Sequence, residues 1–127
     1  MIRLSPDKIE GQAKSFVKDW IQLLSQGKFD DALRQIDEPN NYGIRWTPAA
    51  LLKVISDCCR EKEFKIDDPF LLKGESRSSL VAFKDGSGYS YDYDLPLNGK
   101  WSDLTLQFEF QRRSVDYAVI LHDVHML

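Results

Sequence analysis

Residues 101–111 read WSDLTLQFEFQ, and from Asp103 onward polar and apolar side chains alternate without interruption. Successive side chains of a β-strand point to opposite faces, so this alternation predicts a strand with one apolar face. That face consists of Leu104, Leu106, Phe108 and Phe110.

Upstream of residue 64 the spacing of apolar residues is different, because they recur every three or four positions. This spacing is typical of amphipathic helices. Cap residues, prolines in the first turn and a terminal glycine set the expected ends. The three predicted helices run from Ser5-Pro6 to Gly27, over 29–37, and from Thr47-Pro48 to about Lys62.

Downstream of residue 64 the apolar period becomes two, and turn residues separate the segments. The predicted strands are a short one at 64–66 and longer ones at 79–84, 89–95 (stopping at Pro96), 101–111 and, after a turn at 112–114, 115–125. The last strand is apolar on both faces, which predicts a central or well-covered position. We therefore expect one α+β domain over residues 1–127. Its three N-terminal helices should pack on a curved antiparallel sheet of about four to five strands.

The charge balance narrows the classes of partner. The 127 residues hold 17 basic and 20 acidic side chains, a net charge of −3, which argues against direct binding to nucleic acid. Residues 1–64 hold ten of each sign, whereas residues 65–127 hold seven basic and ten acidic side chains, so the predicted sheet half is acidic. No apolar run is long enough to span a membrane, and no signal peptide is recognisable.

The two cysteines also bear on the compartment. Cys58 and Cys59 are adjacent, so they cannot form an unstrained disulfide with each other on a helix. We expect reduced thiols and a cytoplasmic location.

Both histidines of the chain lie in His122-Asp123-Val124-His125. On a regular strand His122 and His125 point to opposite faces and could not share a metal ion, whereas Asp123 and His125 share a face. An acid–base pair of Asp123 and His125 is one interpretation, and a purely structural pair is favoured over it.

Residues 89–94 read YSYDYD, which places three tyrosines on one side of a strand and Asp92 and Asp94 on the other. The favoured interpretation is that the tyrosines face the core. If the tyrosine side were exposed, it would form a protein-binding strip. Asp92 and Asp94 are expected to form an exposed acidic pair that could steer a basic partner. Asp85 and the pair Asp67-Asp68 could extend this patch.

Three segments carry a resemblance to a known family: AKSFVKDWI at 13–21, GKFDDAL at 27–33 and YAVILHDVH at 117–125. With them the chain resembles the nuclear-transport-factor-2-like (cystatin-like) fold, and in particular small bacterial immunity proteins of toxin systems. The resemblance implies a curved sheet that wraps the N-terminal helices into a cone. It also implies that an Asp and a His inside the cone could transfer protons.

Two functional hypotheses follow. The first is a non-enzymatic immunity protein that occludes the active surface of a basic toxin, possibly a nuclease, without any cofactor or metal. Its expected partner-binding residues are Asp67, Asp68, Asp85, Tyr91, Asp92, Tyr93 and Asp94. The second is a cone-fold enzyme or small-ligand binder with a pocket formed by Trp20, Trp46, Tyr117, Asp123 and His125. A scaffold that dimerises through its sheet is a third option, so the oligomeric state stays open.

Overall fold

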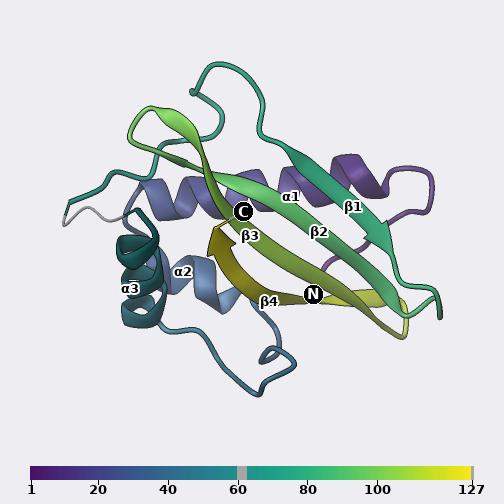
Figure 1. Ribbon diagram of the computed structural model, residues 1–127. Helices are drawn as coiled ribbons and strands as arrows, with labels where there is room; N and C mark the ends of the chain where they lie inside the picture. Colours follow the sequence, from purple (N-terminus) through teal and green to yellow (C-terminus); the bar gives the residue numbers. More distant parts are fainter. Residues whose placement is uncertain (60–62, 127) are drawn as a thin grey trace.

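The computed structural model describes residues 1–59 and 63–126. In it three helices precede a four-stranded antiparallel sheet of order β1-β2-β3-β4 (Figure 1), which confirms the expected α+β class. The helices are α1 (Ile9–Ser25), α2 (Phe29–Arg34) and α3 (Pro48–Cys59). The strands are β1 (Ser78–Ala82), β2 (Gly88–Leu97), β3 (Lys100–Arg113) and β4 (Asp116–Met126).

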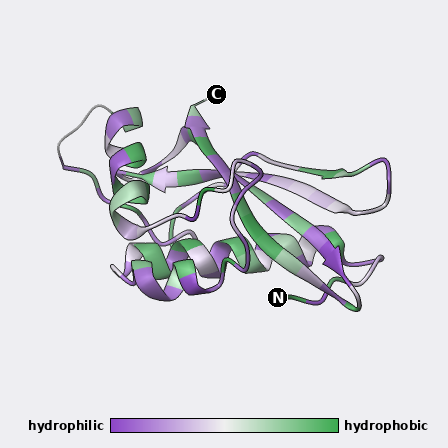
Figure 2. Ribbon diagram, turned by 90° about the horizontal axis from the view of Figure 1, so that it is seen from below, coloured by the Kyte–Doolittle hydropathy of each residue, from purple (hydrophilic) through white to green (hydrophobic). Residues whose placement is uncertain are grey.

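The core lies between the helices and one face of the sheet. Leu104, Leu106, Phe108 and Phe110 of β3 are all buried on this face, as the alternation at 101–111 predicts. Trp20 of α1 meets the Phe108 ring edge-on at 5.2 Å, and its indole N–H donates to Ala32 O of α2 at 2.7 Å. In Figure 2, α1 lies below the strands as a separate layer that carries both hydrophobic and hydrophilic residues.

Several element ends differ from the sequence-based expectation, each for a local reason. Helix α1 begins at Ile9 rather than next to Ser5, because the Ser5 N–H donates to Gln12 Oε1 at 2.7 Å and residues 6–8 form a turn. Strand β2 continues through Pro96, since its register with β3 shifts between Asp94 and Pro96. A proline is tolerated at such an irregularity because no ladder N–H is needed there.

The remaining boundaries are close to those expected. Thr47 Oγ1 accepts the Ala50 N–H at 3.1 Å at the start of α3, which confirms that cap, whereas the expected end near Lys62 lies outside the described residues. The short strand expected at 64–66 is reduced to one bridge between Ile66 and Leu97. At the β1–β2 hairpin, a Cβ on Gly88 would lie 2.0 Å from Phe110 O, so β2 can approach β3 this closely only with glycine there.

Strand β4 is an edge strand, and not a central one, but its outer edge is well covered. The Ile2 N–H and C=O pair with Tyr117 at 3.0 and 2.8 Å. Trp46 Nε1 donates to Leu121 O at 2.9 Å, and Asn40 Nδ2 donates to His122 O at 3.1 Å. Uncovered edges invite pairing with other chains, so these contacts protect β4.

Asp37 makes the tightest contact at this edge. Its N–H donates to Val119 O at 2.8 Å, and its Oδ2 accepts the Val119 N–H at 2.8 Å. Its Oδ1 also accepts the N-terminal amino group of Met1 at 2.9 Å. These contacts explain why α2 ends at Arg34 rather than at residue 37, because Asp37 pairs with the sheet instead of continuing the helix.

The segment from Asp68 to Glu75, which connects the Ile66 bridge to β1, crosses α1 through three side chains spaced one helical turn apart. Gln22 Nε2 donates to Asp68 Oδ2 at 3.0 Å, and Lys14 Nζ lies 3.3 Å from Glu75 Oε2. Between them, Lys18 Nζ lies 4.5 Å above the centre of the Phe70 ring. We call this segment the strap.

Replacing Asp37 with alanine should destabilise the protein by about 1–3 kcal/mol, because the Val119 N–H loses its acceptor at a partly buried position. Chemical denaturation monitored by circular dichroism measures this change. Asp31→Ala is the matched control: among the described residues Asp31 makes an exposed ion pair with Arg34, so its removal should cost less than about 0.5 kcal/mol. Equal losses for the two variants would contradict the role assigned to Asp37.

Candidate functional site

The side of the sheet that points away from the helices carries most of the polar side chains of β2, β3 and β4, and we call it the helix-free face. In Figure 1 the strands pass in front of α1, so this face is toward the reader. Cross-strand pairs place Asp92 beside Gln107 and Asp94 beside Thr105. The acidic side chains on this face or at its β4 edge are Asp92, Asp94, Asp103, Glu109 and Asp123, and together we call them the acidic face.

A β-bulge in β4 brings both histidines to the helix-free face. Gln107 is opposite Asp123 and Phe108 is opposite Leu121, so His122 is an extra residue in the ladder. Leu121 and Val124 can therefore both remain in the core. The expectation that His122 and His125 point to opposite faces is wrong, because it assumed a regular strand.

Each histidine lies beside a carboxylate. His122 Nδ1 is 3.3 Å from Glu109 Oε2, and His125 Nδ1 is 3.2 Å from Asp123 Oδ2, which confirms the expected proximity of Asp123 and His125. Both nitrogens are buried, and neither is aligned for a hydrogen bond within the described part of the chain. Glu109 is only 7% exposed and accepts a further hydrogen bond from Gln111 Nε2 at 2.9 Å.

Asp92 lies on β2 opposite Gln107 of the same face and is half-buried. Its Oδ1 is buried without a hydrogen-bond partner among the described residues. Burial raises the pKa of the Asp92 carboxyl; the nearby His125 lowers this pKa, and the charge of Asp94 raises it. The fold thus disfavours the charged form of Asp92.

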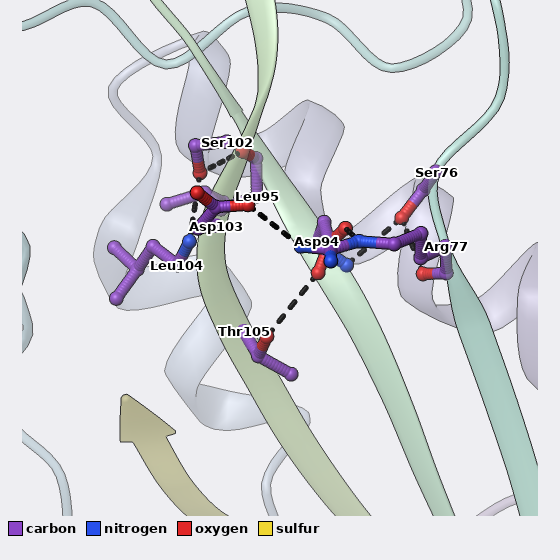
Figure 3. A network of polar contacts seen from close by, with 8 residues as sticks. All are labelled: Ser76, Arg77, Asp94, Leu95, Ser102, Asp103, Leu104 and Thr105. Atoms are coloured by element: carbon purple, nitrogen blue, oxygen red, sulfur yellow. Dashed lines mark hydrogen bonds and ion pairs between the residues drawn. The ribbon is translucent and has the colours of Figure 1, made fainter. Parts of the chain in front are cut away.

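Asp94 is buried and structural, so the expectation of an exposed Asp92–Asp94 pair is wrong. It is 3% exposed, its Oδ2 accepts from Arg77 Nε at 2.8 Å, and its Oδ1 accepts from Thr105 Oγ1 at 3.2 Å. The Asp94 N–H donates to Ser76 Oγ at 2.8 Å (Figure 3). Arg77 also reaches Asp103 Oδ1 at 2.8 Å, so one exposed guanidinium bridges two acids.

The other expected partner-binding residues are dispersed. Tyr91 and Tyr93 are buried in the core, as the favoured interpretation predicted, and burial raises the pKa of Tyr93 to about 12. Asp85 lies in the β1–β2 turn, where hydrogen bonds from Ser87 lower the pKa of its carboxyl. Because Asp85 precedes β2, the length of this strand separates it from Asp67 and Asp68.

Asp67 and Asp68 are engaged in holding loops near the end of β2. Asp67 Oδ2 accepts the Gly99 N–H at 2.7 Å. Asp68 accepts the Phe70 N–H at 2.9 Å in addition to its contact with α1. These acids therefore do not extend the acidic face.

The structure does not bring the residues of the expected pocket together. Trp20 is fully buried on the helix side of the sheet, and Tyr117 packs on the same side near the start of β4. His125 is on the helix-free face, and Asp123 lies beside it at the β4 edge. The space inside the layers is filled by the large buried side chains Trp20, Tyr91, Tyr93, Phe108 and Phe110.

Among residues 1–59 and 63–126, no group of three His, Cys, Asp or Glu side chains is arranged to hold a metal ion. In the same residues no helix has the length and hydropathy needed to cross a bilayer.

Residues 21–127 match the family model described as a domain of unknown function, DUF7668. The chain belongs to the DUF7668 family. No curated protein and no solved structure matches this DUF7668 chain. The match covers all four strands and α2 and α3, so every residue of the acidic face lies within the matched range.

Sequence reasoning missed part of the DUF7668 site. Glu109, Asp103 and Gln107 alternate with the apolar residues of β3, so their shared face was readable from 101–111. Tyr42 was not singled out, although it is 77% exposed and its ring stacks on His122 with a centroid distance of 6.0 Å. No local signal in the sequence indicates that contact, because a long loop brings Tyr42 to β4.

Asp92→Asn should stabilise the fold at neutral pH. Because the pKa of Asp92 is raised, the folded state holds this proton more tightly than the unfolded state. The stabilising contribution of the protonated group is present below the ordinary carboxyl value of 3.8 and is lost as pH rises through the folded pKa. The advantage of Asp92→Asn over wild type should therefore grow from about pH 4 to pH 7. Thermal unfolding of both proteins across that range measures it. A constant difference would contradict this assignment.

Proposed function

We propose that this protein is a non-enzymatic binding domain of the immunity type, which neutralises a cognate bacterial toxin by covering a basic active surface. Toxins that cut nucleic acid need basic surfaces to hold phosphates. A carboxylate-rich surface is complementary to such a site and would accelerate association.

The observation that carries the proposal is an open sheet face with an excess of acidic side chains. No described helix covers this face. Arg77 lies among its acids, and Arg113 at the end of β3 pairs with Glu38 and donates to Gln111 Oε1 on the same face. Asp94 and Asp103 are engaged by Arg77, whereas Glu109 and Asp123 are accompanied by imidazoles.

Exposed groups at the border of this face are suited to contact a partner. Asp123 is 51% exposed, and the exposed Tyr42 ring stacks on the neighbouring His122. Tyrosine is enriched among the residues that contribute most to binding, because it combines a large apolar ring with a polar hydroxyl. We assign Tyr42, Asp103 and Asp123 as the main contacts, in place of the buried Tyr91, Tyr93 and Asp94.

The proposal includes two finer points. The first is a likeness to nuclear-transport-factor-2-like proteins, supported by helices that precede an antiparallel sheet. The second is a cytoplasmic location, supported by the placement of Cys58 and Cys59 next to each other on α3, where they cannot form an unstrained disulfide with one another.

Reversing the charge at two exposed positions, Asp103→Lys with Asp123→Lys, should weaken binding to a toxin encoded beside this gene by about tenfold or more at low salt. The loss should shrink as salt is added, because exposed charges are screened. Isothermal titration or biolayer interferometry at several salt concentrations measures both effects.

The matched control is Asp7→Lys with Asp30→Lys, which changes the net charge equally at exposed positions of the helix side. It should bind like wild type. Equal weakening by both double variants would mean that only net charge matters. Unchanged affinity in Asp103→Lys/Asp123→Lys would reject the acidic face as the binding surface.

A further inference from the structure

The two edge strands of the sheet differ in how far other segments of the described chain cover them. The β4 edge is covered by Ile2, Asp37, Asn40 and Trp46, as described above. β1 forms the opposite edge, and no strand of the described chain pairs along its outer side. It also contains no proline, no charged residue and no bulge, which are the usual devices that block pairing.

The hydrogen bonds between β1 and β2 show which backbone N–H and C=O groups of β1 point away from β2 and are available to another strand. The Phe83 N–H donates to Gly88 O at 2.9 Å, so Phe83 belongs to a hydrogen-bonded pair. Because such pairs alternate along antiparallel strands, Ser79 and Val81 also bond to β2. The N–H and C=O groups of Ser78, Leu80 and Ala82 therefore point outward, away from β2.

From this edge we infer that β1 pairs with β1 of a second copy of the chain, in an antiparallel register centred on Leu80. In that register Leu80 faces Leu80 of the second copy and Ser78 faces Ala82, so all the outward backbone groups are paired. Two four-stranded sheets become one continuous sheet. This association uses the backbone edge of β1 and does not rest on the proposed toxin binding, which is assigned to side chains of the helix-free face.

The side chains of β1 are self-complementary in this register. Ser79 and Val81 face each other across the junction on the helix-free side, where Val81 is 55% exposed as a monomer. Arg77 faces Phe83 of the second copy, and no two like charges are directly opposite. Like charges opposite each other destabilise a strand pair, so their absence favours this partner.

The short edge limits the affinity. β1 has five residues, so the contact is small and dissociation in the micromolar range is expected. Sedimentation velocity of wild type from about 1 µM to roughly 0.5 mM should show a concentration-dependent change from monomer to dimer.

A charge swap tests the register. Ser79→Lys/Val81→Lys places two pairs of lysines opposite each other, whereas Ser79→Lys/Val81→Glu places two Lys–Glu pairs there. Both variants replace Ser79 and Val81 with charged residues, so each loses the apolar Val81 side chain equally. They differ only in the sign of the charge at position 81. The dissociation constant of Ser79→Lys/Val81→Lys should be at least about fivefold weaker than that of Ser79→Lys/Val81→Glu. Circular dichroism checks that both variants fold.

Amide hydrogen exchange gives a second, residue-specific measurement. In the dimer the amides of Ser78, Leu80 and Ala82 should gain protection relative to dilute samples, whereas those of Ser79 and Val81 should change little. A wild-type protein that stays monomeric at 0.5 mM overturns the inference. Equal dimerisation of the two charge variants, or protection gained elsewhere than β1, overturns it as well.

Discussion

The alternation along β3 is the constraint on which the rest of the structure depends. Its apolar residues pack against the aromatic side chains of α1 on one face. Its polar residues lie beside polar residues of β2 and β4 on the other face. A shift of this strand by one residue would exchange the two faces and bury Glu109 in the core. The alternation along β3 therefore determines both which residues form the hydrophobic core and which form the acidic face.

The bulge in β4 is a local exception to this alternation, and it has a chemical effect. Without the extra residue His122, Leu121 and Val124 could not both lie in the core. With it, both imidazoles of the chain lie among carboxylates on the same face. The bulge that keeps Leu121 and Val124 in the core therefore also places both imidazoles beside carboxylates on the helix-free face.

The change of apolar period near residue 64 was enough to predict the helices, the longer strands and the antiparallel order. It could not predict contacts that join distant segments. The pairing of Asp37 with Val119, the stacking of Tyr42 on His122 and the ion pair of Arg77 with Asp94 depend on tertiary placement. For the same reason, the exposure of Asp92 and Asp94 was misjudged. Strand parity gives the face of a side chain, whereas its burial depends on neighbours across the sheet.

The strap contacts α1 through three side-chain interactions that are individually weak and partly exposed, and its Lys73 C=O accepts one hydrogen bond from Trp101 Nε1 of β3 at 3.0 Å. Its backbone contributes no strand or helix between Asp68 and Glu75. A segment of this kind can detach from the surface while the sheet remains intact. Insertions or deletions in it also change the entropy of closing the loop only slightly. Relatives of this protein can therefore differ in length here without losing the fold, and the strap is the natural place for the chain to acquire new surface features.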